Sequence, residues 1–95
     1  METEDCKGYI YILTTKDNNV LYIGSTVDLK RRLRQHKNGH TIFTHKYHLS
    51  KLVWYQEFAS ISNARIREKQ MKKWNRQWKI NIINKLNPHW TDLDL

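Results

Sequence analysis

Two short apolar runs that carry tyrosines, separated by a polar turn, constrain the fold of this chain more than any other feature. The runs occupy residues 8–15 and 20–24, and both are rich in the β-branched and aromatic residues that favour strands. Residues 16–19 between them are polar turn material. The pattern therefore predicts an antiparallel hairpin. Alternation along its first strand places Tyr9, Tyr11 and Leu13 on one face, and Ile10 and Ile12 on the other.

A basic helix, capped by Thr26 or Asp28, is expected to follow the hairpin and to end near residue 38. Leucines four residues apart, at positions 29 and 33, would anchor it on the sheet. Arg32 and His36 have the same spacing, so they share a neighbouring face of this helix. The hairpin and the helix therefore bring phenols, a guanidinium and an imidazole into one short segment.

The remainder of the chain predicts a loop, a third strand and more helix. The loop spans residues 39–50 and the strand residues 51–58, and a helical stretch then runs from Ser62 to near Leu86, before Pro88. A bend is expected near Asn75. The order ββαβαα predicts an α+β fold, with a small three-stranded antiparallel sheet flanked by helices. A single domain would cover residues 1–95, with residues 1–6 and 94–95 as mobile ends.

Basic residues dominate the body of the chain. Between residues 6 and 91 there are 17 Lys and Arg residues against four acidic residues, because five of the nine acids lie nearer the ends. A body this basic favours a polyanionic partner, most simply nucleic acid. A soluble domain with a merely basic surface is the alternative. The aromatics are spread through the chain rather than gathered on one basic helix, which argues against a membrane-surface helix.

Other patterns limit the location of the protein. No run approaches the roughly 18 apolar residues of a membrane span. The acidic N-terminus lacks the basic start and the apolar stretch of a signal peptide. Cys6 is the only cysteine, so no internal disulfide can form. We therefore expect a cytoplasmic protein with no membrane partner.

Tyr11 and Tyr22 come from adjacent strands of the hairpin, and ordinary sheet aromatics would account for either of them. Alternatively, a phenol that is activated by nearby cations can take a proton from an attacking water. Arg32 could hold a phosphate, or it could be one solvated charge of a basic helix. His36 could contact a phosphate, a nucleophile or a tyrosine hydroxyl, or it could be an exposed helical histidine.

Glu68 lies on an apolar stripe. Ala64, Met71, Trp74 and Trp78 follow one another at spacings of seven, three and four, and Glu68 falls among them. A lone carboxylate on an inward face costs stability unless it is paired or binds a metal. A buried Glu–Arg pair and a divalent metal site are both open at this point. A hard ion such as Mg²⁺ suits one carboxylate together with waters and phosphate oxygens.

These residues resemble the GIY-YIG endonuclease superfamily. The second half of that motif is intact as Tyr22-Ile23-Gly24, and the first appears as Tyr9-Ile10-Tyr11, with a tyrosine in place of the first glycine. The resemblance covers roughly residues 7–93 and is strongest to the small stand-alone bacterial branch. The chain is also similar to the nuclease domain of the excision-repair incision subunit. Further matching segments are Asp28–Leu33, Phe43–Tyr47, Lys51–Tyr55, Arg67–Trp74 and Asn87–Leu93.

The resemblance implies a metal-dependent endonuclease that hydrolyses DNA phosphodiester bonds with one Mg²⁺ or Mn²⁺ ion. The matching positions imply a catalytic set of Tyr11, Tyr22, Arg32, His36, Glu68 and Asn87, in which Glu68 holds the metal. Asn81 and Asn84 remain alternatives to Asn87. We expect the basic residues of the helices and the loop to hold the DNA backbone, namely Lys30, Arg31, Arg34, Lys46, Lys72 and Lys73.

One departure from the family pattern affects the chemistry. The excision-repair subunit has a lysine directly after its Tyr-x-Gly, where this chain has Ser25. The group that activates Tyr11 is therefore open, with a metal-bound water, Lys30 and Lys46 as candidates.

The sequence leaves three functional classes. The first is an endonuclease that acts in DNA repair, recombination or processing. The second is a nucleic-acid-binding module with the nuclease fold and little or no catalysis. The third, a protein-interaction adaptor, would use the tryptophan surface, but the four tryptophans sit at core-like spacings: Trp54, Trp74, Trp78 and Trp90. Nothing outside the catalytic domain is expected to read a target, so branched, nicked, single-stranded and RNA substrates all stay open, as does the oligomeric state.

Overall fold

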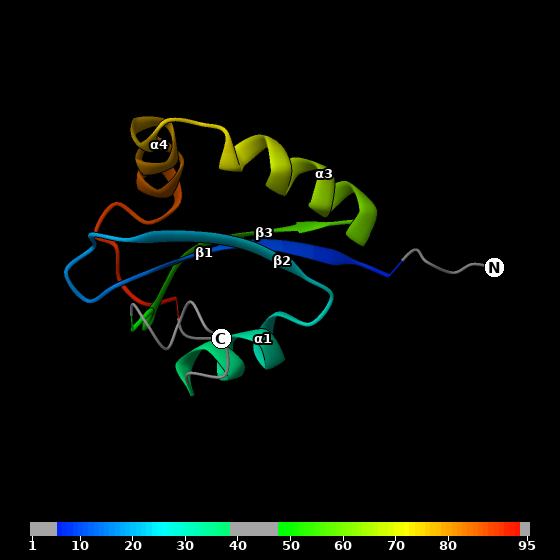
Figure 1. Cartoon of the computed structure of the whole chain (residues 1–95), viewed down its shortest axis with the longest axis horizontal. Helices are drawn as coiled ribbons and strands as arrows, with labels where there is room; N and C mark the ends of the chain where they lie inside the picture. Colours follow the sequence, from blue (N-terminus) through cyan, green and yellow to red (C-terminus); the bar gives the residue numbers. More distant parts are fainter. Residues whose placement is uncertain (1–5, 39–47, 94–95) are drawn as a thin grey trace.

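A three-stranded antiparallel sheet forms the middle layer of the structure, a computed structural model that describes residues 6–38 and 48–93. The strands are β1 (Gly8–Thr14), β2 (Leu21–Thr26) and β3 (Lys51–Phe58), and their order in the sheet is β2-β1-β3. Helix α1 (Leu29–Lys37) covers one face, whereas α3 (Ile61–Lys72) and α4 (Arg76–Leu86) cover the other (Figure 1). The predicted α+β class and the order ββαβαα are confirmed.

Strand β1 is the central strand, and its alternation creates two cores. Ile10 and Ile12 face the α3 and α4 layer, where they join the core that contains Met71 and Ile83. The opposite face of β1 packs against α1, in a core with Tyr11, Leu13, Leu29, Leu33, Leu49 and Leu52. The alternation predicted from the sequence is therefore confirmed, and so is the anchoring of α1 by its two leucines.

The helix ends follow from short polar side chains. Asp28 caps α1, because its carboxylate accepts a hydrogen bond from the backbone N–H of Arg31 at 3.1 Å. Ser60 caps α3 in the same way, and Asn75 caps α4 by accepting from the N–H of Trp78 at 3.0 Å. The helical stretch predicted from Ser62 to Leu86 is thus broken, rather than bent, at Asn75.

The break at Asn75 ends the apolar stripe. Ala64 and Met71 are buried and Trp74 packs against the core, but Trp78 is 56% exposed. Because α4 begins anew after Asn75, the helical spacing that aligned Trp78 with the stripe no longer applies. The predicted core position of Trp78 is wrong.

A C-terminal segment closes the outer edge of β3. The N–H of Leu93 donates to the carbonyl of Leu52 at 2.7 Å, and the N–H of Leu52 donates to the carboxylate of Asp92 at 3.0 Å. Asp92 also forms an ion pair with Lys37 of α1, at 3.3 Å. In the described ranges, no helix has the length and hydropathy needed to cross a membrane.

Candidate active site

The hydroxyl of Tyr11 is the centre of a buried polar cluster on the α1 face of the sheet. It lies 3.0 Å from Nε2 of His36, and Nε of Arg32 donates to it at 3.4 Å. Tyr11 is 1% exposed and His36 is 2% exposed. The two α1 side chains reach the same oxygen because they are four residues apart, as the sequence spacing predicts.

Gly24 makes room for the Tyr11 hydroxyl. The two residues face each other across the β1–β2 pair, and a Cβ at position 24 would lie 2.5 Å from the phenol oxygen. That distance is far shorter than any ordinary contact, so a side chain at position 24 would displace the hydroxyl. The glycine of the Tyr-Ile-Gly run is therefore explained by the close approach of Tyr11.

The buried setting controls the protonation of the cluster. Burial raises the pKa of Tyr11, although the hydrogen bond from Arg32 opposes that rise. Burial and the nearby charge of Arg32 lower the pKa of His36 to about 4. At neutral pH the phenol therefore keeps its proton and the imidazole is neutral. Of the candidate activating groups, Lys46 lies outside the described residues, and the cation bonded to Tyr11 is Arg32 rather than Lys30.

Tyr22 completes the cluster from β2. Its ring centroid lies 6.2 Å from that of Tyr11 and 5.2 Å from that of His36. The ring thus covers the polar pair from the edge strand of the sheet.

Glu68 approaches the same strand from the opposite face. Its side chain is 17% exposed, and Lys72 pairs with Oε2 at 2.8 Å. The hydroxyl of Ser25 donates to Oε1. Of the two alternatives left open for this carboxylate, the buried Glu–Arg pair is not observed, since the ion-pair partner is a half-exposed lysine.

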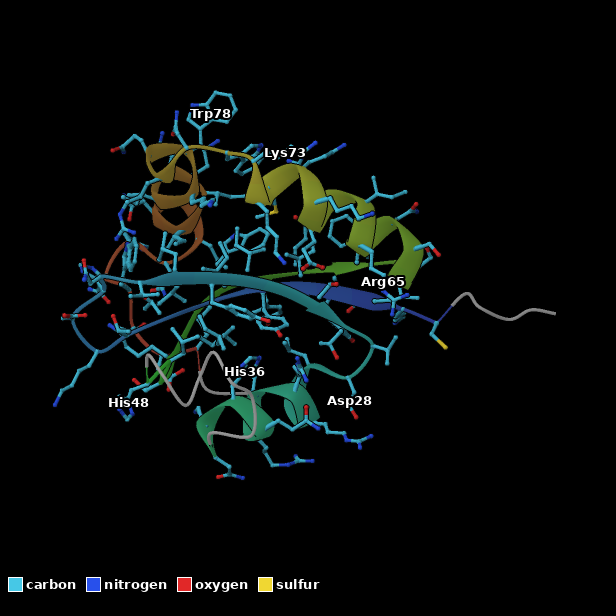
Figure 2. The ribbon with its side chains drawn as sticks, viewed as in Figure 1. Asp28, His36, His48, Arg65, Lys73 and Trp78 are labelled. Carbon is cyan, nitrogen blue, oxygen red and sulfur yellow. The ribbon has the colours of Figure 1, made fainter. Side chains whose placement is uncertain are left out.

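The end of β2 joins the two groups of residues. Gly24 and Ser25 are neighbours on this strand, and they contact the Tyr11 cluster and Glu68 respectively. An open pocket of 280 Å³ lies where β2 passes into α1, between the labelled Asp28 and Arg65 in Figure 2. Its lining residues are Ser25, Thr26, Val27, Asp28, Arg31, Arg32, Gln35 and Arg65. A phosphate in this pocket would meet three guanidinium groups.

Comparison with known proteins shows the family to which the chain belongs. A sequence model of the GIY-YIG catalytic domain matches residues 7–81. The chain belongs to the GIY-YIG family. The predicted family resemblance is therefore confirmed.

Relatives of this GIY-YIG chain include small UPF0213 proteins. The UPF0213 protein of Syntrophus aciditrophicus is 38% identical over 84 residues, which cover 86% of this chain and 94% of the relative. That of Clostridium perfringens is 36% identical over 77 residues, covering 80% and 82%. The solution NMR structure of UPF0213 protein BH0048 from Bacillus halodurans has a TM-score of 0.57 and 28% identity, and covers 88% of this chain and 89% of that one. These GIY-YIG relatives are small stand-alone proteins.

The structure does not bring Asn87 to the pocket at the end of β2. Its buried side-chain amide donates to the carbonyls of Val53 and Thr91 and accepts from the N–H of Thr91. These bonds fix the chain after α4, and the place of Asn87 in the catalytic set stays a prediction. The two alternative asparagines also bond locally, Asn81 to Gln77 and Asn84 to Trp90.

The predicted DNA-contacting residues divide between two elements. Arg31 lines the pocket, and Lys30 and Arg34 are exposed beside it on α1. Lys72 and Lys73 are exposed at the end of α3, and Lys46 lies outside the described residues. Their role in binding stays a prediction.

Glu68 is a suitable metal ligand for a GIY-YIG site, although residues 6–38 and 48–93 contain no group of three or more His, Cys, Asp or Glu side chains that could hold a metal. Magnesium needs few protein ligands, because waters and phosphate oxygens complete its shell. The Glu68 carboxylate and the Ser25 hydroxyl supply oxygen atoms beside the pocket, so the residues fit such an ion.

Sequence reasoning assigned no role to Ser25, Gln35 or Arg65. Gln35 accepts a hydrogen bond from Arg32 at 3.0 Å and so orients the guanidinium. The signal for Ser25 was its place directly after Tyr-Ile-Gly on the alternate face of the strand. No comparable signal marks Arg65, because its position depends on how α3 packs over the sheet.

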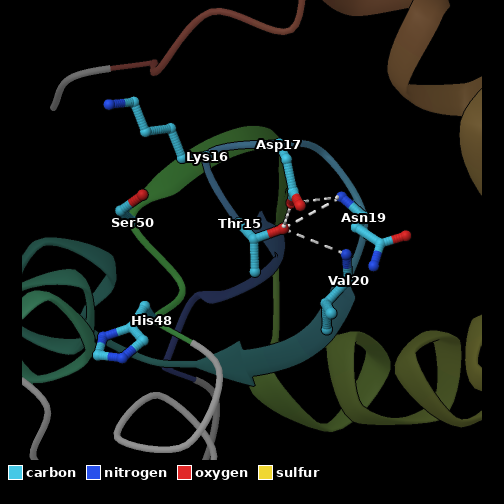
Figure 3. Close-up of a pocket in the computed structure, with 7 residues that line it drawn as sticks. All are labelled: Thr15, Lys16, Asp17, Asn19, Val20, His48 and Ser50. Atoms are coloured by element: carbon cyan, nitrogen blue, oxygen red, sulfur yellow. Dashed lines mark hydrogen bonds between the residues drawn. The ribbon is translucent and has the colours of Figure 1, made fainter.

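A larger cavity lies at the turn between β1 and β2 (Figure 3). It measures 790 Å³ and is lined by Thr15, Lys16, Asp17, Asn19, Val20, His48 and Ser50. The hydroxyl of Thr15 donates to Asp17 and accepts from the backbone N–H groups of Asn19 and Val20. These groups hold the turn, and none of the Tyr11 or Glu68 partners lines this cavity.

Proposed function

We propose that this GIY-YIG protein is a metal-dependent endonuclease that hydrolyses DNA phosphodiester bonds in the pocket at the end of β2. The observation that carries the proposal is the convergence at this point of a buried phenol–imidazole pair, a guanidinium and a carboxylate. These are the groups that phosphodiester hydrolysis uses for proton transfer and for charge stabilisation. The protein acts in repair, recombination or processing of DNA in the cytoplasm.

The phosphate binds against the guanidinium groups of the pocket. Arg32 holds the scissile phosphate and offsets the charge that develops on its oxygens, while Gln35 fixes the orientation of Arg32. Arg31 and Arg65 line the same pocket and neutralise the adjoining backbone. Lys30, Arg34, Lys72 and Lys73 continue this basic surface, and DNA binding through them depends on salt.

Tyr11 acts as the general base by passing its own proton on. Because burial raises the pKa of Tyr11, the free phenol cannot begin as a phenolate at neutral pH. Its oxygen takes a proton from the attacking water while the phenol proton moves to Nε2 of His36, 3.0 Å away. Tyr22 holds the pair in place from β2.

GIY-YIG nucleases generally use divalent metal ions. In this chain Glu68, supported by the hydroxyl of Ser25, would hold Mg²⁺ or Mn²⁺, which supplies Lewis-acid stabilisation of charge on the phosphate and the leaving oxygen. Lys72 pairs with the same carboxylate in the free protein and keeps its charge compensated.

A nucleic-acid-binding module with little catalysis is the second candidate. The ion pair between Glu68 and Lys72 favours it, because that pair satisfies the carboxylate without a metal. A binding module, however, has no use for a phenol and an imidazole buried together behind the pocket.

A cleavage panel tests the proposal. The substrates are duplex, nicked, branched and single-stranded DNA, together with RNA of the same sequence, at low ionic strength with Mg²⁺ or Mn²⁺. We expect cleavage of at least one DNA that EDTA abolishes and that the Glu68→Gln protein, purified identically, does not perform. Binding without cleavage of any substrate would favour the binding module.

A further inference from the structure

A further concave site lies on the outer side of α3 and α4. It measures 330 Å³, at the lower end of the ~300–1,000 Å³ typical of ligand pockets. Its lining residues are Arg67, Trp74, Trp78, Asn81, Ile82 and Lys85. Figure 2 shows Trp78 projecting outward from α4, on the side away from the sheet. We call this site the tryptophan groove.

The walls of the tryptophan groove are prearranged. The rings of Trp74 and Trp78 meet edge to face, with centroids 5.9 Å apart and planes at 73°. The guanidinium of Arg67 lies over the Trp74 ring, 5.0 Å from its centroid. Trp78 keeps 56% of its surface exposed, so a large part of an aromatic side chain is open to a ligand. An aromatic surface of this kind suits a ligand that has a flat ring.

Charge decides which flat ligand fits. Arg67 and Lys85 are charged members of the lining, and among the described residues no carboxylate lines the groove. The ligand is therefore flat and carries negative charge close to its ring. An unpaired nucleotide has this combination, because its base can stack on an indole while its phosphate meets a lysine or an arginine. A base inside a duplex is already stacked on both sides and cannot enter.

We propose that the tryptophan groove is a stacking site for an unpaired nucleotide of single-stranded DNA or RNA. Trp78 supplies the stacking surface, Trp74 and Arg67 hold it in place, and Lys85 pairs with the backbone phosphate.

The groove and the catalytic pocket are linked through α3. Glu68 bonds to Ser25 on the sheet side, whereas the preceding residue, Arg67, belongs to the groove. Consecutive residues of a helix point about 100° apart, so a single strand of nucleic acid can pass from the pocket around α3 to the tryptophan groove. This proposal rests on the proposed function. The substrate of the nuclease would then be a nucleic acid with a single-stranded segment next to the cut.

The test measures binding of three fluorescein-labelled probes by anisotropy in the Glu68→Gln background, which removes cleavage from the measurement. The probes are a 20-nucleotide oligo-dT, a strand of equal length with abasic sites throughout, and a blunt duplex. We expect Trp78→Ala to weaken oligo-dT binding about 5- to 150-fold, because one stacked base contributes ~1–3 kcal/mol. Binding of the abasic strand should not depend on Trp78, since it keeps the phosphates and lacks the bases.

Ile66→Ala is the matched control, because Ile66 is an equally exposed apolar residue, at 58%, on α3. It should leave oligo-dT binding at the level of the background protein. Unchanged oligo-dT binding by Trp78→Ala would overturn the inference, as would an equal loss for the abasic strand. A change in sedimentation with protein concentration that disappears in Trp78→Ala, without a change in oligo-dT affinity, would assign the groove to self-association instead.

A second measurement does not depend on the Trp78→Ala protein. Oligo-dT, but not the abasic strand, should quench the tryptophan fluorescence of the protein, and Trp78→Phe should remove most of that quenching. Absence of quenching overturns the inference even if Trp78→Ala fails to fold. Binding that depends on Trp78, without cleavage in the panel, would support the stacking site and reject the nuclease. Cleavage without binding that depends on Trp78 would support the nuclease and reject the stacking site.

Discussion

The two faces of the sheet hold their functional side chains in opposite ways around β2. On the α1 face, Tyr11 and His36 are almost fully buried and bonded to each other. On the α3 face, the Glu68 side chain is 17% exposed and is paired with Lys72, whose side chain is 53% exposed. The phenol–imidazole pair is thus held in a dry, fixed environment, while the charged carboxylate stays within reach of solvent and ions.

This difference matches the demands of the two tasks. A proton transfer over a short distance needs fixed geometry, which close packing provides. A metal ion must enter and leave with its waters, so its ligand benefits from partial exposure. If this division is correct, substitutions on the α3 face should alter metal dependence, and substitutions on the α1 face should alter rate and stability together.

The largest effect is expected from Glu68→Gln. Glutamine keeps the shape and can still accept from Ser25, but it provides no negative charge for a cation. We expect cleavage to disappear while DNA binding stays largely intact. Because pairs with exposed lysines contribute only about 0–1 kcal/mol, the melting temperature should change by a few degrees at most.

Glu57→Gln is the control, since Glu57 is a carboxylate on β3 that pairs with Lys7 and does not line the pocket at the end of β2. It should cut at the wild-type rate. If Glu68→Gln instead mainly lowers thermal stability and still cuts, Glu68 is an ion-pair partner only and leaves the site.

The next largest effect is expected from Tyr11→Phe, which removes the hydroxyl at the centre of the buried cluster on the α1 face. The ring and its packing remain, but the proton acceptor is lost, so cleavage should fall ~10²–10⁴-fold. His36 also loses its hydroxyl partner, so the free energy of unfolding should fall by about 1–3 kcal/mol. Single-turnover rates, binding and urea melts measure the three properties separately.

Tyr22→Phe provides the comparison within the same cluster. We expect a smaller loss of rate, because Tyr22 supports the pair without taking the proton. A larger loss at Tyr22 would exchange the two roles. Wild-type rates in both variants would make the hairpin a scaffold and favour the binding module.

A moderate effect is expected from Ser25→Ala, which removes the hydroxyl that donates to Glu68. Loss of such a supporting group typically weakens metal binding about 10–100-fold. The Mg²⁺ concentration needed for half-maximal cleavage should rise accordingly, and excess Mg²⁺ should restore the rate. Ser62→Ala, at an exposed position of α3, serves as the control. A loss that excess metal does not repair would show that Ser25 acts on the phosphate instead.

The smallest effect concerns the pH dependence of stability. The pKa of His36 is lowered from 6.5 to about 4 in the folded protein, so between these values the unfolded chain binds more protons. The free energy of unfolding should therefore fall as the pH drops from about 6.5 to about 4, and His36→Gln should flatten this part of the curve. Urea melts at several pH values measure it, with His89→Gln, at an exposed histidine, as control. An unchanged slope in His36→Gln would mean that His36 is accessible to protons in the native state.

The α1 face was predictable because its geometry is local. Strand alternation placed Tyr11, and a spacing of four placed Arg32 beside His36, so the cluster follows from 26 consecutive residues. The partner of Glu68 was not predictable, since Ser25 lies 43 residues away and meets it only through the packing of α3 over β2. The prediction of a core position for Trp78 was wrong for a third reason. A new helix begins after the capping residue Asn75, so the helical spacing from Trp74 no longer applies.

The C-terminal segment has a consequence for shortened forms of the protein. Asp92 and Leu93 satisfy backbone groups of β3 that would otherwise form an open sheet edge, and Asp92 also holds Lys37, next to His36 on α1. A chain cut before Asp92 would offer that edge for pairing with other molecules and would aggregate more readily. It would also remove the ion pair between Asp92 and the helix that carries His36.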